Sequence, residues 1–202
     1  MKLDFNWKND GNVHAYCIHC HAETVDRQRI NGNTQYYCST CNKYYDRWVK
    51  IDPEVKWWLS EDKEYWHEST GVFVRSPDYK FLFFKRNVFP FALTVPSGHV
   101  DTGEEPKHSA TRELEEEVGI EANANALHHI ATDDIIGDAC SRGADAHRWH
   151  AYILELSNFT QPIEVKEEGH TPIWLTLDEA SKKTLTSPVK YIIDHYANLL
   201  SN

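Results

Sequence analysis

Three glutamates at helical spacing are the residues of this chain best suited to chemistry. Glu113, Glu116 and Glu117 stand at positions i, i+3 and i+4, so a helix would carry their side chains on one face. Neighbouring carboxylates repel one another, and a bound cation relieves that repulsion. Oxygen ligands suit hard divalent ions such as Mg²⁺ and Mn²⁺. The alternative is a solvated acidic face, which is what such a run means in most helices.

The surrounding residues extend these glutamates into a longer motif. Residues 98–120 read GHVDTGEEPKHSATRELEEEVGI. This stretch resembles the Nudix box at every fixed position of that motif, which here are Gly98, Glu104, Arg112, Glu113, Leu114, Glu116, Glu117, Gly119 and Ile120. Many relatives have two glycines where this chain has Ser97-Gly98. By this resemblance the chain is identified as a Nudix hydrolase.

The resemblance implies a reaction and a set of roles. Nudix hydrolases cleave a pyrophosphate linkage in a nucleoside diphosphate that is joined to another group. The metal ligands would be the carbonyl of Gly98 and the three helix glutamates, while Arg112 and Glu104 would orient the loop and the helix. Mg²⁺ or Mn²⁺ would neutralise the phosphate oxygens and lower the pKa of bound water, and a spare carboxylate would take the proton. Which glutamate acts as this base differs among relatives and stays open.

Two residues outside the motif are further candidates. Many relatives supply a glutamate from a loop before a later strand, and Glu168 stands in such a place, six residues before Trp174. It would act as a metal ligand or as the general base, with an exposed loop acid as the alternative. Arg86 ends the segment KFLFFKR and is a candidate phosphate contact; the alternative is a solvated strand end.

Four cysteines predict a second metal site. Cys17 and Cys20 form one CxxC pair, and Cys38 and Cys41 form another. Between the pairs, Asn31-Gly32 favours a two-residue hairpin turn, which makes the layout that of a zinc ribbon. Four thiolates close a tetrahedral Zn²⁺ site, so the ion would be structural; disulfides and a redox CxxC are the alternatives.

The remaining cysteine and the histidines carry no pattern that marks them as catalytic. Cys140 is interpreted as an ordinary buried thiol. His99 and His147 are placed near the expected cleft, but a single histidine is more often packed or solvated than an acid–base group. Arg142 and Asp145, on a long loop after the box, are expected to shape the pocket.

The order of ribbon and box resembles that of the NADH pyrophosphatases and favours NADH, NAD, ADP-ribose or a similar nucleotide as substrate. Those enzymes carry an SQPWPFPxS-like array, which this chain lacks after its box. Two alternatives stay open. One is a noncatalytic nucleotide-sensing module, which would tend to lose box glutamates. The other is an enzyme similar to isopentenyl-diphosphate isomerases, which would need a reactive cysteine such as Cys140 near the cleft.

Composition limits the partners. A net charge of −10 argues against nonspecific binding to nucleic acid, which needs clustered lysine and arginine. An apolar signal segment and a run long enough to span a membrane are both missing from the sequence, so a soluble, cytoplasmic protein is expected. Because dimerisation is common in the family, the resemblance also implies a homodimer.

The expected fold is an α/β/α sandwich with a mixed sheet, preceded by a small zinc-ribbon β domain. We expect the ribbon at residues 1–50, a linker at 51–66 and the Nudix domain at 67–202. The tryptophans Trp57, Trp58 and Trp66 are interpreted as packing between domains, with base stacking as the alternative. Alternating apolar residues and turn signals predict strands at 71–75, 80–85, 91–95, 126–132, 148–156 and 172–175. Helices are predicted at 104–118, 178–183 and 188–200.

Overall fold

The N-terminal quarter of the chain forms two small antiparallel sheets in the computed structural model, which describes residues 1–158 and 162–201. One sheet pairs β1 (His14–Cys17) with β5 (Trp48–Ile51), and the other has the order β2 (Val25–Ile30), β3 (Asn33–Cys38), β4 (Lys43–Tyr45). The predicted turn at Asn31-Gly32 is confirmed, because both residues have positive φ, 50° and 85°, between β2 and β3.

The larger part of the chain is built on one eight-stranded mixed sheet. Its central path runs β11 (Leu127–Ile136), β12 (Ala146–Glu155), β7 (Tyr65–Arg75), β8 (Phe81–Arg86), β13 (Gly169–Leu175). The pair β12–β7 is parallel and the other pairs are antiparallel. Short strands extend this path: β6 (Trp57–Leu59) and β10 (Ser97–His99) pair with β7, and β9 (Leu93–Thr94) pairs with β8.

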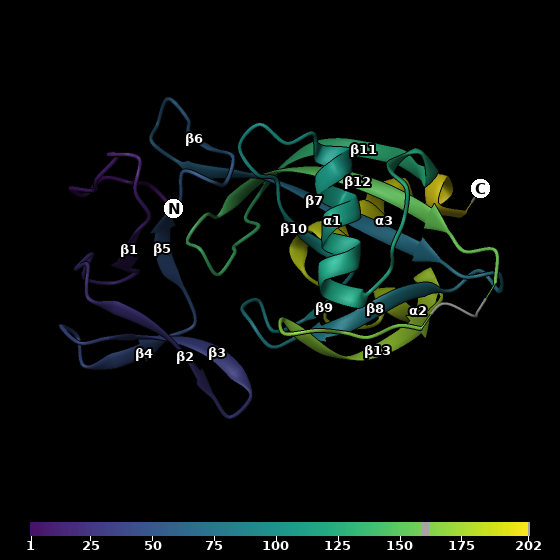
Figure 1. The fold of residues 1–202 in the computed structure, drawn as a ribbon, viewed down its shortest axis with the longest axis horizontal. Helices are drawn as coiled ribbons and strands as arrows, with labels where there is room; N and C mark the ends of the chain where they lie inside the picture. Colours follow the sequence, from purple (N-terminus) through teal and green to yellow (C-terminus); the bar gives the residue numbers. More distant parts are fainter. Residues whose placement is uncertain (159–161, 202) are drawn as a thin grey trace.

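Helices cover both faces of this sheet, as expected for an α/β/α sandwich (Figure 1). Helix α1 (Pro106–Val118) packs Ala110, Leu114 and Val118 on one face, against alternate residues of β7 and β8 such as Val72 and Leu82. Helices α2 (Leu177–Ser181) and α3 (Ser187–Ser201) cover the other face, where the intervening strand residues point. Successive side chains of β7 and β8 therefore point to opposite faces of the sheet and pack into two apolar cores.

The box helix and the strand before it differ in length from the expectation. α1 begins at Pro106 rather than Glu104 and ends at Gly119, whose φ of 72° is the predicted left-handed C-cap. The strand expected at 91–95 shrinks to β9, because a hydrogen bond from Ala92 N to Pro90 O closes a turn there. A 3-10 turn, η1 (Ala124–Ala126), leads into β11.

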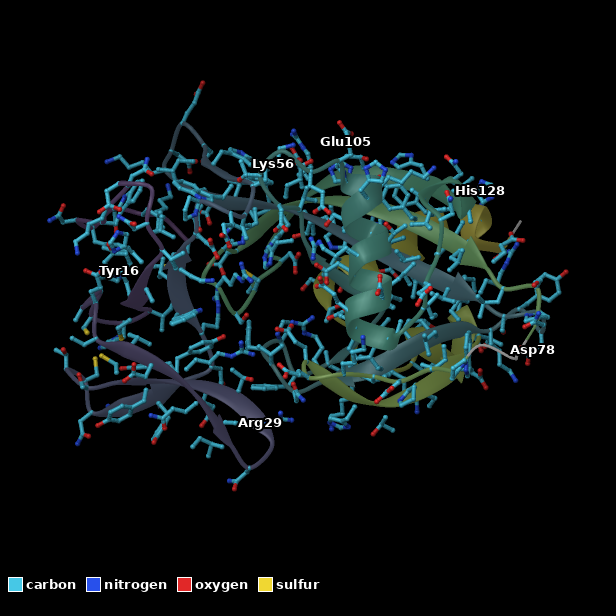
Figure 2. The ribbon with its side chains drawn as sticks, in the orientation of Figure 1. Tyr16, Arg29, Lys56, Asp78, Glu105 and His128 are labelled. Atoms are coloured by element: carbon cyan, nitrogen blue, oxygen red, sulfur yellow. The ribbon has the colours of Figure 1, made fainter. Side chains whose placement is uncertain are left out.

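The segment 51–66 carries strand residues as well as connecting turns. Here β6 pairs with the first residues of β7, and the rings of Trp58 and Trp66 stack at 5.7 Å between centroids. Trp57 packs edge-on against Trp7 and Tyr65, so it joins the N-terminal part to the large sheet. Figure 2 places Tyr16 at the N-terminal end of the molecule and Asp78 at the other. The domain boundaries themselves stay a prediction. Within the described residues, no helix is long and apolar enough to cross a membrane.

Candidate functional site

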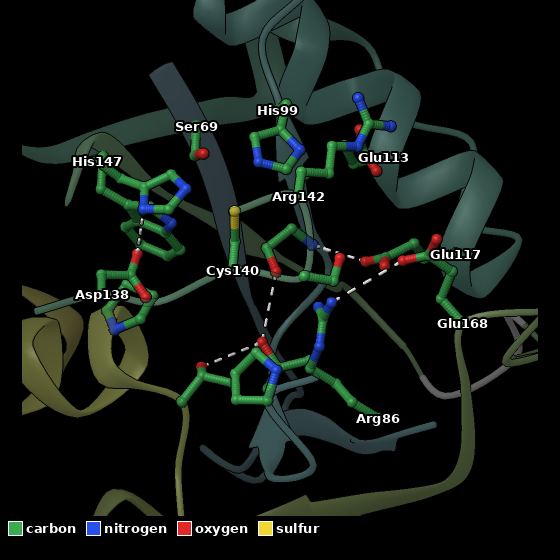
Figure 3. A pocket seen from close by; sticks show the side chains of 18 of the residues that line it. Ser69, Arg86, His99, Glu113, Glu117, Asp138, Cys140, Arg142, His147 and Glu168 are labelled. Atoms are coloured by element: carbon green, nitrogen blue, oxygen red, sulfur yellow. Dashed lines mark hydrogen bonds and ion pairs between the residues drawn. The ribbon is translucent and has the colours of Figure 1, made fainter. Parts of the chain in front are cut away.

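A cavity of about 550 Å³ lies beside the N-terminal part of the large sheet (Figure 3). Its walls are α1, the turn before β10, the loop 138–142 and the loop 166–168. The residues expected to bind the catalytic metal or the phosphate all line it: Arg86, Gly98, Glu113, Glu116, Glu117 and Glu168. The structure thus gathers residues from separate parts of the sequence around one space, and the alternative of a purely solvated acidic face does not describe them.

The backbone before α1 is held directly against the glutamates. β10 pairs with β7, with Gly98 opposite Thr70, and this fixes the loop at the N-terminal side of the helix. Ser97 N donates a hydrogen bond of 2.7 Å to Glu117 Oε2. Gly98 has no room for a side chain, because a Cβ there would lie 2.1 Å from Glu113 Oε1. A glycine is therefore required for the close approach of this backbone to the carboxylate.

Arg112 of α1 connects the helix of the box to the loop that precedes it. Its guanidinium donates to Glu104 Oε2 at 3.0 Å and to Glu113 Oε1 at 2.7 Å. It also donates to the carbonyl of His99 at 3.1 Å, which lies at the end of β10. These contacts tie the helix to the loop that precedes it, which is the arrangement the family resemblance implies for Arg112 and Glu104.

Burial makes the two inner carboxylates electrostatically unusual. Glu113 and Glu117 are 9% and 8% exposed, whereas Glu116 is exposed. Burial, together with the neighbouring Glu116, raises the pKa of Glu113 to about 7. Burial and the charge of Glu113 raise the pKa of Glu117 well above its ordinary value. Buried carboxylates that repel one another, beside a backbone with no space for a Cβ, fit a hard divalent cation.

Glu168 lies at the rim of the cavity beside α1, because Lys166 N of its loop donates a hydrogen bond of 2.9 Å to the carbonyl of Glu117. Glu168 Oε2 is 3.9 Å from Arg86 Nη2, and Glu168 Oε1 is 3.8 Å from Nη2 of Arg27, which belongs to β2. The backbone of Asn87 donates to the carbonyl of Glu168 at 3.0 Å and so holds the loop against the end of β8. No sequence pattern places Arg27 here, because its segment indicates only one strand of a hairpin.

The loop after β11 forms the wall of the cavity that lies nearest the N-terminal sheets. Trp48 N and Lys50 N of β5 donate to the carbonyls of Ser141 and Arg142, each at 3.0 Å. The guanidinium of Arg47 donates to the carbonyl of Cys140 at 2.8 Å. Arg142 lines the cavity as expected, whereas Asp145 is not among the described lining residues. Asp145 forms an ion pair with Arg47 instead.

Three histidines and one cysteine form a group at this wall that no sequence pattern predicted, and three of its members, His99, Cys140 and His147, line the cavity. His67, His99, Cys140 and His147 place one ligand atom each within 4.8 Å of one another. Cys140 is therefore not an isolated thiol, and the two histidines considered earlier are not solitary. Burial raises the pKa of the Cys140 thiol, but His147 and His67 outweigh it and hold that pKa well below the usual range. Four separate segments supply these residues, so no spacing in the sequence could reveal them.

The four ribbon cysteines also converge. Their sulfur atoms lie within 4.8 Å of one another, with Cys17 Sγ 3.8 Å from Cys41 Sγ and Cys20 Sγ 3.7 Å from Cys38 Sγ. Tetrahedral bonds of about 2.3 Å to one Zn²⁺ would separate the sulfurs by about 3.8 Å. The cluster therefore fits a zinc ribbon.

Comparisons with known proteins agree with this geometry. The NUDIX domain family matches residues 65–196. An asymmetrical bis(5′-nucleosyl)-tetraphosphatase of Caenorhabditis elegans is 26% identical over 103 residues, 51% of this chain and 72% of that protein. The protein of the same name from Rattus norvegicus is 33% identical over 87 residues, 43% of this chain and 57% of that protein.

Two solved structures are similar in fold. A C. elegans Ap4A hydrolase binary complex has a TM-score of 0.52 at 20% identity, covering 66% of this chain and 98% of that chain. The NUDIX domain of Shewanella oneidensis NrtR, complexed with ADP ribose, has a TM-score of 0.55 at 16% identity, covering 66% of this chain and 88% of that chain.

Proposed function

This chain belongs to the Nudix hydrolase family, and we propose that it hydrolyses a pyrophosphate bond in a nucleoside diphosphate linked to another moiety. One observation carries the proposal. The backbone of Gly98 and the carboxylates of Glu113, Glu116 and Glu117 line one cavity that is large enough for part of a nucleotide.

We assign the metal site to the Gly98 carbonyl, Glu113, Glu116 and Glu117, with Glu168 reaching it from the rim. When bound there, Mg²⁺ or Mn²⁺ would neutralise phosphate oxygens and acidify a water molecule. The side chains of the protein have simpler tasks. Arg112 keeps the glutamates oriented through its contacts with Glu104 and Glu113.

Arg86 and Glu168 would act on the substrate side of the site. Arg86 is only 14% exposed in its side chain and stands between the sheet and Glu168, so its guanidinium can contact a phosphate inside the cavity. The proton acceptor is either Glu168 or a box glutamate. The pH–rate profile of Glu168→Gln separates these roles, because losing the base removes the limb of the profile that reports its titration.

The proposed substrates are NADH, NAD, ADP-ribose and related nucleotides, to which the curated relatives add dinucleoside polyphosphates. The test is Mg²⁺- and Mn²⁺-dependent hydrolysis across this panel, with nucleotide sugars and nucleoside triphosphates included. Glu117→Gln serves as the control for contaminating phosphatases. A substrate cleaved by the wild type and spared by the variant supports the proposal, and silence of a folded, zinc-loaded protein across the panel contradicts it.

The ribbon cluster is proposed to hold a structural Zn²⁺. Its four thiolates leave no open position for chemistry, and the short strands around it bury few apolar side chains of their own. Figure 1 shows these strands beside the large sheet, and hydrogen bonds from β5 reach the loop of the cavity wall. We propose that the zinc keeps β5 and Arg47 in place against that loop.

An isomerase remains the second candidate, because Cys140 lines the same cavity as the glutamates. A Cys140→Ser variant with wild-type turnover would exclude a nucleophilic or acid–base role for the thiol. A noncatalytic sensor is disfavoured by the intact box.

A further inference from the structure

Four potential metal ligands meet at the wall of the cavity: His99, Cys140 and His147 line it, and the buried His67 stands behind them. β7 is the central strand here: it carries His67, and its neighbour β12 carries His147 directly opposite in the parallel register. β10, on β7, ends with His99, and the loop after β11 brings Cys140 (Figure 3). The distance from Cys140 Sγ to His67 Nδ1 is 3.7 Å.

The three imidazole rings of the cluster are packed closely together. The centroid of the His67 ring lies 4.6 Å from that of His99 and 5.5 Å from that of His147, in edge-to-face orientations. His67 and His147 are almost completely buried, at 1% and 2% exposure. Burying polar rings against one another is costly unless their nitrogens find partners, and a thiol is a weak one.

A cysteine–histidine pair would need only one imidazole to activate the thiol. Here three imidazoles surround one thiol, and the four residues each place one ligand atom within 4.8 Å of the others. Neutral imidazole and thiolate are the forms that bind metal ions, so binding of an ion would release any proton that these groups hold. The number of nitrogen donors around the sulfur therefore exceeds what a catalytic pair requires and matches a metal site.

A carboxylate completes the surroundings of the cluster. Asp138 Oδ2 lies 3.1 Å from His147 Nδ1, close enough for an ion pair although the geometry is not that of a hydrogen bond. A carboxylate behind a ligating histidine is the usual second neighbour of zinc sites, because it fixes the ring with its other nitrogen toward the ion. Asp138 is itself nearly buried, at 7% exposure.

We propose that His67, His99, Cys140 and His147 bind one Zn²⁺ ion or a similar transition-metal ion. This site is distinct from the four-cysteine site of the ribbon and from the glutamate site of the box. Nitrogen and sulfur ligands select such an ion over Mg²⁺, which prefers oxygen. Zn–N and Zn–S bonds of about 2.0–2.3 Å require ligand atoms about 3.3–3.8 Å apart, so small rotations of the side chains close the site.

The location of this site indicates a structural role for the ion. It joins β7, β10 and β12 to the loop that carries Arg142, and it does so at the surface of the catalytic cavity. The opposite side of this loop is held by β5 and Arg47. The ion therefore fixes the wall against which a substrate would lie, while the glutamates hold the ions needed for hydrolysis.

The test is the zinc content of the full-length protein, measured by plasma mass spectrometry after dialysis against Zn²⁺ and then metal-free buffer. The wild type should hold one more zinc per chain than Cys140→Ala, and His99→Gln should show the same loss. Cys20→Ser should lose the ribbon zinc instead. His128→Ala is the matched control and should keep the wild-type content, because His128 is exposed near the start of β11, whereas Cys140 follows the end of that strand (Figure 2).

Cobalt provides a second readout that separates binding from misfolding. In Co²⁺-substituted protein, the difference spectrum between wild type and Cys140→Ala should contain a thiolate-to-metal charge-transfer band and tetrahedral ligand-field bands. Circular dichroism establishes that each variant is folded. Equal zinc content in wild type, Cys140→Ala and His99→Gln, without a cobalt difference spectrum, would overturn the proposal. Glu117→Gln should keep the full zinc content, so a failure of the proposed hydrolase activity is distinguishable.

Discussion

Gly98→Ala should separate activity from stability. A methyl group on Gly98 would lie 2.1 Å from Glu113 Oε1 and 2.2 Å from its carboxyl carbon. Carbon atoms in contact are about 3.5 Å apart, so the carboxylate would have to move by about 1 Å or more. The backbone of Gly98 is not in the left-handed region, so an alanine can adopt its φ and ψ without strain, and the clash with Glu113 is the sole cost expected.

The expected effects on stability and on rate follow from which atoms of Glu113 the new methyl group displaces. The displaced atoms are the far end of a flexible side chain, so we expect the free energy of unfolding to change by less than about 1 kcal/mol. The same atoms are proposed metal ligands, and a misplacement of about 1 Å costs roughly 100-fold in rate, or about 3 kcal/mol of activation free energy. The assay compares kcat and the Mn²⁺ dissociation constant with urea unfolding.

Gly103→Ala is the matched control, with the reverse pattern expected. A Cβ at Gly103 meets nothing within 4 Å, but its φ of 85° is strained for alanine. This variant should lose about 1 kcal/mol of stability and keep its turnover and Mn²⁺ affinity. If Gly98→Ala instead retained wild-type kcat and Mn²⁺ binding, the assignment of Glu113 as a metal ligand held against this backbone would be refuted.

Three further outcomes are expected. Glu117→Gln should abolish turnover and leave a folded protein, as measured by kcat and circular dichroism. A wild-type rate in this variant would contradict the assignment of Glu117 to the metal site. Cys38→Ser should release one zinc per chain and unfold the ribbon, and stoichiometric zinc in the variant would contradict the four-thiolate site. The third outcome concerns protein from which a chelator has removed the divalent ions. Burial raises the pKa of Glu113 to about 7 from 4.5, so the folded state holds that proton more tightly than the unfolded state does. Its contribution is complete below about pH 4.5 and is lost as pH rises through about 7. Urea unfolding should show a loss of roughly 2–3 kcal/mol between about pH 5 and about pH 8, which Mg²⁺ reverses; stability that rises over this range would contradict the buried carboxylate.

The elements that could be predicted from the sequence are those whose signals are local. The box helix has a proline at its start and the C-cap Gly119, and the strand β8 alternates apolar residues toward two cores. The beginning of β7 could not be recognised in the same way. Its residues Glu68, Ser69 and Thr70 are polar yet buried, because their partners come from other segments, such as Lys56 for Glu68. Tertiary contacts there override the polarity that suggests a loop.

The same distinction applies to the site. The box glutamates were predictable because one helix and the loop before it supply them, so their spacing alone brings them together. His67 and Cys140 are 73 residues apart and meet only when β7, β12 and the loop after β11 are assembled. Asp145 shows the opposite error. It lies on the expected loop, but its carboxylate is used by Arg47 rather than by the cavity.

The ribbon and the cavity are coupled through few, identifiable contacts. Arg47 and β5 hold the wall that carries Cys140, while Arg27 of β2 stands 3.8 Å from Glu168 on the opposite rim. Gly143 allows the wall to approach β5, because a Cβ there would lie 2.8 Å from Trp48 O. Both sides of the cavity therefore depend on strands that the ribbon cysteines organise. Loss of the ribbon zinc should consequently weaken substrate binding without altering a single box glutamate, which distinguishes a supporting ribbon from one that only recruits a partner.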